Sequence, residues 1–249
     1  MSTPSVCLAY ITANETEHVE RSIAAMRQHP WVTKIIVLTT NITKAATVSD
    51  NIDSHFYDFG TGFNHHPEEG GFHELNARNK AVILAERAGC DWTLICDSDE
   101  FYTPSTFEEI KVAHQTRKDV VWFPCYHFID PTHYVTWPAS WNRPPGSTMP
   151  VHDAHARAFR SSAKFRYVKN PNNKFRSTLF NWTMHCHIKP HPASRVRVSY
   201  AMNHIHTHHM FEPKRPGKET LDRWVKHESR EFMPEVYQEA WKLQQLSRL

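Results

Sequence analysis

The chain has 249 residues and a formal net charge of +3, which suits one domain or two closely packed halves. Hydrophobic residues make up 40% and charged residues 22%, which excludes an intrinsically disordered chain. Its seven glycines form no G-x-G-x-x-G or Walker sequence, which excludes phosphate-binding loops of those types. No apolar run approaches the roughly 20 residues of a membrane helix. The N-terminus also lacks a signal-peptide pattern, so we expect a cytoplasmic protein without a membrane partner.

The first 130 residues alternate between strand and helix patterns. Short apolar runs rich in β-branched residues predict strands, and apolar residues at helical spacing predict helices. The strands are expected over 6–11, 33–38, 56–59, 92–96 and 120–124, and the helices over 14–29, 74–88 and 105–115. This alternation predicts an α/β fold with a mainly parallel sheet flanked by helices.

The pattern changes after residue 130. Frequent prolines together with Trp137 and Trp141 predict loops and irregular strands. A helical pattern returns only near Glu219, with apolar residues at 221, 224 and 225. We therefore expect an α/β core over residues 1–130 and an irregular, basic C-terminal half over residues 131–249.

Charge is distributed very unevenly. Residues 1–153 contain 11 Lys and Arg against 19 Asp and Glu, whereas residues 154–218 contain 13 Lys and Arg against the single acid Glu212. Two explanations stay open: the basic segment docks on the acidic half, or it faces a polyanion such as a nucleic acid. For the second explanation, the candidate acceptor-binding residues are Trp141, Lys164, Arg166, Lys169, Arg176 and Trp182.

An acidic triplet follows the strand expected over 92–96. In an extended segment Asp97 and Asp99 project to the same side, with Ser98 between them. The carboxyl end of a strand in an open α/β sheet is where ligands usually bind. Carboxylate oxygens suit Mg²⁺ or Mn²⁺, which keep positions open for substrate phosphates. The alternative is a solvated turn that caps the next helix.

Two further groups point to ligands. Arg78 and Lys80 lie in the early turns of the helix expected over 74–88, where positive charge opposes the helix dipole and suggests a bound anion such as a diphosphate. The alternative is that both side chains extend to solvent. Among the 19 histidines, His204 and His206 would share one face of an extended segment, as metal ligands or as ordinary structural histidines. A separate zinc site using His185 and His187 also stays open.

The run from Asn76 to Lys80, the helix after it, and Gly89 through Asp97-Ser98-Asp99-Glu100 resemble GT-A-fold glycosyltransferases of the family-2-like group. The resemblance covers about residues 5–125. It implies a GT-A-like core in which Asp99 contacts a divalent metal that bridges the donor diphosphate. Asp97 would lie near the donor ribose or reach the metal through water, and His206, then His204, would complete the metal site. The nucleotide would lie on Tyr10, Thr12, Asn14 and Glu15, with Arg78, Lys80, Asp97 and Ser98 also on the donor.

An inverting sugar transfer needs a carboxylate that accepts the proton of the acceptor hydroxyl. Asp130, Asp153 and Glu212 are the only acids between residues 120 and 218. Of these, Asp153 is the first candidate and Asp130 the second. A reaction that retains configuration would need no such base.

The sequence therefore predicts a metal-dependent glycosyltransferase that uses Mn²⁺ or Mg²⁺ and a nucleotide-sugar, with a UDP-sugar as first choice. The basic segment suits a polyanionic acceptor, and the chain is similar to small bacteriophage enzymes that glycosylate hydroxymethylated pyrimidines in DNA, which act in the host cytoplasm. The alternatives are a glycosyltransferase acting on a bacterial surface glycan, a metal-dependent phosphodiesterase or nuclease, and a non-catalytic nucleic-acid-binding protein.

Overall fold

A computed structural model of the protein describes residues 3–12, 16–27, 29–39, 52–56, 73–97, 100–130, 133–135, 154–168, 187–188, 195–199, 204–206, 224–226 and 238. Within this part of the chain, no helix has both the length and the apolar character that crossing a membrane requires. The elements in chain order are β1 Val6–Thr12, α1 Thr16–Met26, β2 Val32–Thr39, β3 Ile52–Phe56, α3 His73–Arg87, β4 Trp92–Asp97, β5 Glu100–Tyr102, α4 Ser105–Gln115, β6 Val120–Asp130, β7 His133–Val135, β8 Ala154–Arg160, the 3-10 turn η2 Ser161–Ala163, β9 Tyr167–Val168, β10 His187–Ile188, β11 Val196–Val198, β12 His204–His206 and β13 Trp224–Lys226.

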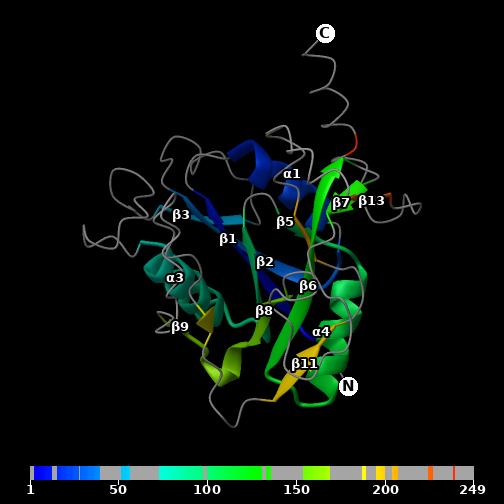
Figure 1. The fold of residues 1–249 in the computed structure, drawn as a ribbon. Coiled ribbons are helices and arrows are strands. Elements are labelled where there is room, and N and C mark those ends of the chain that lie inside the picture. The colour runs from blue at the N-terminus through cyan, green and yellow to red at the C-terminus, as the bar shows by residue number, and fades with distance from the viewer. Residues whose placement is uncertain are drawn as a thin grey trace.

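The main sheet has the strand order β13-β7-β6-β8-β4-β1-β2-β3 (Figure 1). Neighbouring strands from β3 to β4 are parallel, whereas β8 is antiparallel to both β4 and β6. The predicted α/β class with a mainly parallel sheet is confirmed. From the C-terminal half, β8 adds an antiparallel strand between β4 and β6, whereas β11 and β12 pair parallel with β6. β2 and β3 lie on one side of β1 and β4 on the other, so the strand order reverses at the junction of β1 and β4. Such a switch point creates the crevice in which α/β proteins bind ligands.

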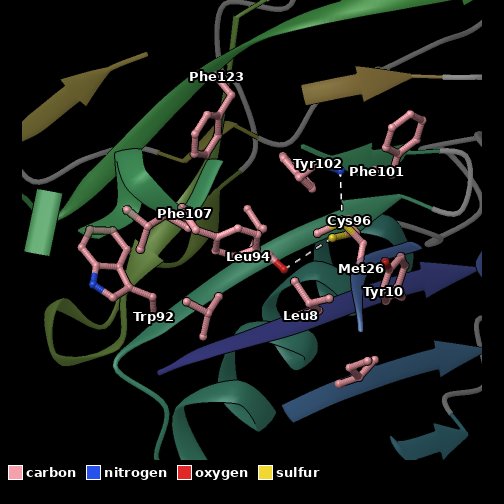
Figure 2. Packing of buried hydrophobic residues seen from close by; sticks show 14 of the residues in the cluster. Leu8, Tyr10, Met26, Trp92, Leu94, Cys96, Phe101, Tyr102, Phe107 and Phe123 are labelled. Carbon is pink, nitrogen blue, oxygen red and sulfur yellow. Dashed lines mark hydrogen bonds between the residues drawn. The ribbon is translucent and has the colours of Figure 1, made fainter. Parts of the chain in front are cut away.

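Helices cover both faces of the parallel strands. In β1, Leu8 and Tyr10 belong to the core cluster that contains residues of α1 and α4, whereas Ala9 and Ile11 pack in the cluster that contains residues of α3. Because side chains alternate along a strand, α1 and α4 lie on one face and α3 lies on the other (Figure 1). Figure 2 shows the first cluster, in which Leu8 and Tyr10 lie among the side chains of Leu94 and Cys96. All four side chains are fully buried.

Local sequence patterns located some elements better than others. α4 spans the expected 105–115, and α3 begins and ends one residue before its predicted limits. The strand predicted over 56–59 overlaps β3 at Phe56, and residues 57–59 lie outside the described part. β3 begins earlier than predicted, with Ile52 opposite Ile35 of β2. The helix expected near Glu219 was wrong at residues 224–226, which form β13 against β7. Trp and Val favour strands as readily as helices when a partner strand is present, and residues 219–223 lie outside the described part.

Candidate active site at the carboxyl ends of β1 and β4

The last residues of β1 and β4 lie side by side at the switch point. The backbone register pairs Ile11 with Asp97, and the next residue, Thr12, pairs with Thr39 of β2. Thr12 is buried, and among the described residues its Oγ1 has no hydrogen-bond partner. Buried hydroxyls usually have a partner, so this edge of the sheet offers one unmet hydrogen-bonding group beside a carboxylate.

Asp97 is held by two arginines from different parts of the chain. Its Oδ1 lies 2.8 Å from Nη2 of Arg78 on α3, and its Oδ2 lies 2.9 Å from Nη2 of Arg157 on β8. The Asp97 side chain is 28% exposed, whereas those of the two arginines are 11% and 7% exposed. Both carboxylate oxygens of Asp97 are thus engaged by protein cations. Arg78, predicted to hold a diphosphate, has this carboxylate as a partner.

Glu100 closes the acidic turn that follows β4. Its Oε2 accepts a hydrogen bond from the backbone N–H of Asp97 at 3.0 Å, and its Oε1 lies 2.6 Å from Nη2 of Arg157. The carbonyl of Glu100 accepts a hydrogen bond from the hydroxyl of Ser22 on α1. The two residues that flank Ser98 and Asp99 are therefore fixed, although Ser98 and Asp99 themselves lie outside the described residues.

The electrostatics of this cluster are balanced. Burial by itself opposes the charge of Arg157, but the carboxylates of Glu100 and Asp97 raise the pKa of its guanidinium well above the usual range. Two acids and two arginines thus form a network of zero formal charge. Removing one partner of such a buried pair leaves an uncompensated charge, which typically costs about 3–5 kcal/mol.

The H-x-H segment lies beside the acidic turn. β12 pairs antiparallel with β5, which places His206 opposite Glu100 and His204 opposite Tyr102 along the backbone. The extended conformation expected for His204 and His206 is confirmed. His206 is therefore close in the sheet to the residue that directly follows Asp99. Among the described residues alone, no three His, Cys, Asp or Glu residues converge on a metal position.

The other candidate donor and base residues are placed as follows. Tyr10 is fully buried, and its hydroxyl lies 2.7 Å from Oγ of Ser22. Lys80 lies on α3 and is partly exposed. Asp130 ends β6, where its backbone pairs with His133. The remaining predicted residues lie outside the described part of the chain: Asn14, Glu15, Trp141, Asp153, Lys169, Arg176, Trp182 and His185.

The basic segment docks on acids of the N-terminal half. Arg166 pairs with both carboxylate oxygens of Glu86 on α3, at 2.6 and 2.8 Å. Among the described cations of residues 154–218, Lys164 is exposed, and the others all have acidic partners in residues 1–153. These ion pairs are Arg157 with Asp97 and Glu100, Arg160 and Arg195 with Asp119, Arg166 with Glu86, and Arg197 with Glu109. The docking explanation of the charge asymmetry therefore applies to the described arginines, including Arg166.

The sequence motif around Arg78 serves to attach this segment to α3. The side chain of Asn79 exchanges two hydrogen bonds with the backbone of Tyr167, at 3.0 and 2.7 Å. The guanidinium of Arg78 lies 5.7 Å from the centre of the Tyr167 ring. Asn79 thereby acts as a strand partner for β9 at the point where the segment passes α3.

Sequence reasoning missed Arg157 and Glu100. A signal was present for each, because Arg157 is the only charge within Ala156-Arg157-Ala158, and Glu100 directly follows Asp99. A lone arginine between alanines in a strand suggests a buried, paired cation. Neither signal identifies the partner, which depends on how β8 meets β4.

Comparisons with known proteins give the following similarities. No protein-family model matches the sequence, and neither does any curated protein. The fold is similar to S. aureus TarS 1–349, at 12% identity and a TM-score of 0.49 over 82% of this chain, and the chain spans 60% of that structure. The complex of TarS 1–349 with UDP matches at 13% identity and a TM-score of 0.48, again over 82% of this chain and 60% of that structure. A mannosyltransferase from Pyrobaculum calidifontis, in complex with GDP-Man and Mn²⁺, matches at 15% identity and 0.37 over 49% of this chain and 35% of its own.

Proposed function

We propose that this protein is a metal-dependent glycosyltransferase that moves a sugar from a nucleotide-sugar to a hydroxyl group. The observation that carries the proposal is the acidic turn at the switch point between β1 and β4, with the backbone of His206 opposite Glu100. Switch points bind ligands. Carboxylates and imidazoles are both ligands of divalent cations, so their presence at this edge favours a ligand that binds together with such a cation.

The ion pairs of Asp97 restrict which residues would hold the cation. Both oxygens of Asp97 are engaged by Arg78 and Arg157, so Asp97 suits an indirect role toward the ribose or a metal-bound water. Asp99 would be the direct carboxylate ligand, with His206, then His204, as the imidazole partner. When bound, Mn²⁺ or Mg²⁺ would supply positive charge for the departing diphosphate.

The nucleotide would lie along the carboxyl end of β1. Thr12 ends that strand with a buried hydroxyl, which the donor could satisfy. Asn14, Glu15, Ser98 and Lys80 remain predicted donor contacts, with a UDP-sugar as the first choice. Tyr10 would support the end of β1 from the buried side of the strand, because its side chain is fully buried and its hydroxyl is hydrogen-bonded to Ser22.

The transfer itself needs one proton acceptor if it inverts configuration. The acceptor oxygen would bond to the anomeric carbon, the bond from that carbon to the diphosphate oxygen would break, and the hydroxyl proton would pass to a carboxylate. Asp153 is our first candidate for this base and Asp130, at the end of β6, is the second. Asp153 directly precedes β8, whose first residue, Ala154, pairs with Pro124.

A hydroxymethylated pyrimidine in DNA is our first choice of acceptor, and a phosphorylated surface glycan is the second. The support for DNA is the basic composition of residues 154–218, of which Lys164 is exposed. The arginines that already pair with acids cannot add to that support. Mass spectrometry of hydroxymethylated and plain DNA after incubation with donor would separate the two acceptor classes.

The activity is tested by incubating the protein with UDP-glucose, UDP-N-acetylglucosamine and GDP-mannose, with and without MnCl₂. UDP and GDP-Man, the ligands named for the similar structures, define this first panel. We expect Mn²⁺-dependent release of free nucleoside diphosphate from one donor class. Nicking of DNA without donor turnover would instead identify a nuclease, and no turnover of either kind would contradict the proposal.

A further inference from the structure

We infer that Arg157 is the positioning residue of the acidic turn, residues 97–100. From a bulge in β8, its guanidinium bonds Asp97 and Glu100, the two residues that flank Ser98 and Asp99, and fixes their relative positions. The inference rests on the proposed function for its consequence, but its structural claim stands on contacts of the described residues.

β8 contains a bulge at Arg157. β8 runs antiparallel to β6, with Ala158 opposite Val121 but Ala156 opposite Trp122. Arg157 is therefore an extra residue that faces no residue of β6. A bulge redirects the side chain of the inserted residue, and bulges are frequent beside active sites.

β8 stops pairing with β4 before the end of β4. The register between these strands ends at Leu94 opposite Ala158, so the last part of β4 lies beyond the paired stretch. Arg157, the next residue of β8, reaches this part of β4 and contacts Asp97 at its end. Register and bulge together aim the guanidinium at the turn.

Arg157 bonds two carboxylates through one nitrogen. The single Nη2 of Arg157 lies 2.9 Å from Oδ2 of Asp97 and 2.6 Å from Oε1 of Glu100. These two carboxylates would otherwise repel each other in a buried place. Glu100 also accepts the backbone N–H of Asp97, so the cation, the carboxylate and the backbone form one closed connection across the turn.

Arg157 comes from the C-terminal half of the chain. β8 belongs to the basic segment, which Asn79 and Glu86 of α3 fix through Tyr167 and Arg166. The conformation of the acidic turn thus depends on correct docking of the C-terminal half. Docking and metal binding are coupled through this one side chain.

The test compares Arg157→Met, which removes the charge, and Arg157→Lys, which keeps it without the planar fork. The matched control is Arg160→Met, because Arg160 lies on the same strand and pairs with Asp119 at the other end of β4. Two properties are measured: the affinity for MnCl₂ in the presence of UDP or GDP, and hydrogen–deuterium exchange of residues 97–100 in the ligand-free protein.

We expect Arg157→Met to weaken Mn²⁺–nucleotide affinity by about 10- to 100-fold, as loss of a residue that orients metal ligands typically does. Exchange over residues 97–100 should become faster, Arg157→Lys should fall between Arg157→Met and wild type, and Arg160→Met should match wild type in both measurements. Wild-type affinity and exchange in folded Arg157→Met would overturn the inference.

If Arg157→Met does not fold, Arg157→Lys decides, and wild-type values for that variant overturn the inference. Failure of both variants to fold also overturns it, because Arg157 would then serve folding alone. If the wild-type protein binds neither Mn²⁺ nor either nucleotide, the proposed function fails, while the exchange measurement still decides the role of Arg157.

Discussion

Two arginines of β8 lie three residues apart and serve opposite ends of β4. Arg160 lies over the ring of Trp92, 5.0 Å from its centre, and donates to the carbonyls of Ala113, His114 and Lys118. Arg157 instead bonds the carboxylates of Asp97 and Glu100. One arginine closes the end of a helix, whereas the other closes an acidic turn at the edge where we propose that the ligand binds.

The two arginines differ in the groups that their guanidinium groups contact. The carbonyls at the C-terminal end of α4 need donors and attract positive charge, so Arg160 satisfies an ordinary structural requirement. Arg157 instead pairs with two acids, which join β8 of the basic segment to the turn after β4. Arg157, bound to two carboxylates at the switch point, belongs to the site where our proposed function places the ligand. The following predictions test this contrast between the two edges of the sheet.

The largest effect is expected for Asp99→Asn. Loss of the direct carboxylate ligand should lower Mn²⁺-dependent donor turnover by about 10³-fold, equivalent to about 4 kcal/mol of transition-state stabilisation. The melting temperature should stay unchanged, because the ion pairs of Arg157 with Asp97 and Glu100 remain in this variant. Steady-state assays and thermal unfolding check both points, and wild-type turnover would remove the metal role of the turn.

Asp97→Asn should differ from Asp99→Asn by lowering stability as well as turnover. The substitution leaves Arg78 and Arg157 with one carboxylate fewer, and the partial exposure of Asp97 places the loss at about 2 kcal/mol, below that of a fully buried pair. Urea unfolding of the two variants measures the contrast. Equal stabilities would mean that the two arginines do not depend on Asp97.

Asp119→Asn tests the opposite edge. Asp119 accepts the backbone N–H of Arg195 at 3.1 Å and lies 3.6 Å from Nε of Arg160, so we expect a loss of about 1 kcal/mol. Mn²⁺ and nucleotide affinities should match wild type, because the proposed ligand site lies at the other end of β4. A clear change in either affinity in the folded variant would blur the distinction between the two ends of β4.

The smallest effect is a pH dependence at the amino-terminal edge. Burial lowers the pKa of His29 below its ordinary value of 6.5, and its ring stacks on that of Trp31. The unfolded chain therefore binds a proton first as the pH falls below about 6.5. Stability should decrease on acidification through that range, and His29→Gln should flatten this part of the curve. An identical pH profile for the variant would rule out the histidine as a source.

Local patterns predicted most elements of the parallel core, with β3 as the exception, since each element there has its own periodicity. The helix over Ser105–Gln115 and the strand over Trp92–Asp97 needed no knowledge of distant partners. β6 extends to Asp130 beyond the predicted 120–124, because β7 and β12 pair with its second half. Such pairing is non-local and leaves little trace in the sequence of one strand.

In the candidate site too, the positions of residues along their own strands were predictable, whereas their partners on other strands were not. The position of Asp97 at the end of β4 followed from the sequence, as did the extended H-x-H segment at His204. The partners of Asp97 did not follow, because the reach of Arg157 depends on a bulge and on the register of β8 against two strands. The role of Asn79 was equally hidden, since its partner is the backbone of Tyr167.

The central claim is that a divalent cation binds at the turn after β4 together with the donor diphosphate. A crystal of the protein soaked with MnCl₂ and UDP, or GDP where that nucleotide is preferred, tests it through the anomalous scattering of manganese. We expect one peak bonded to the carboxylate of Asp99 and to the nucleotide, with Asp97 still bound by Arg78 and Arg157. Bound nucleotide without manganese at Asp99, or manganese at a distant position, would contradict the account.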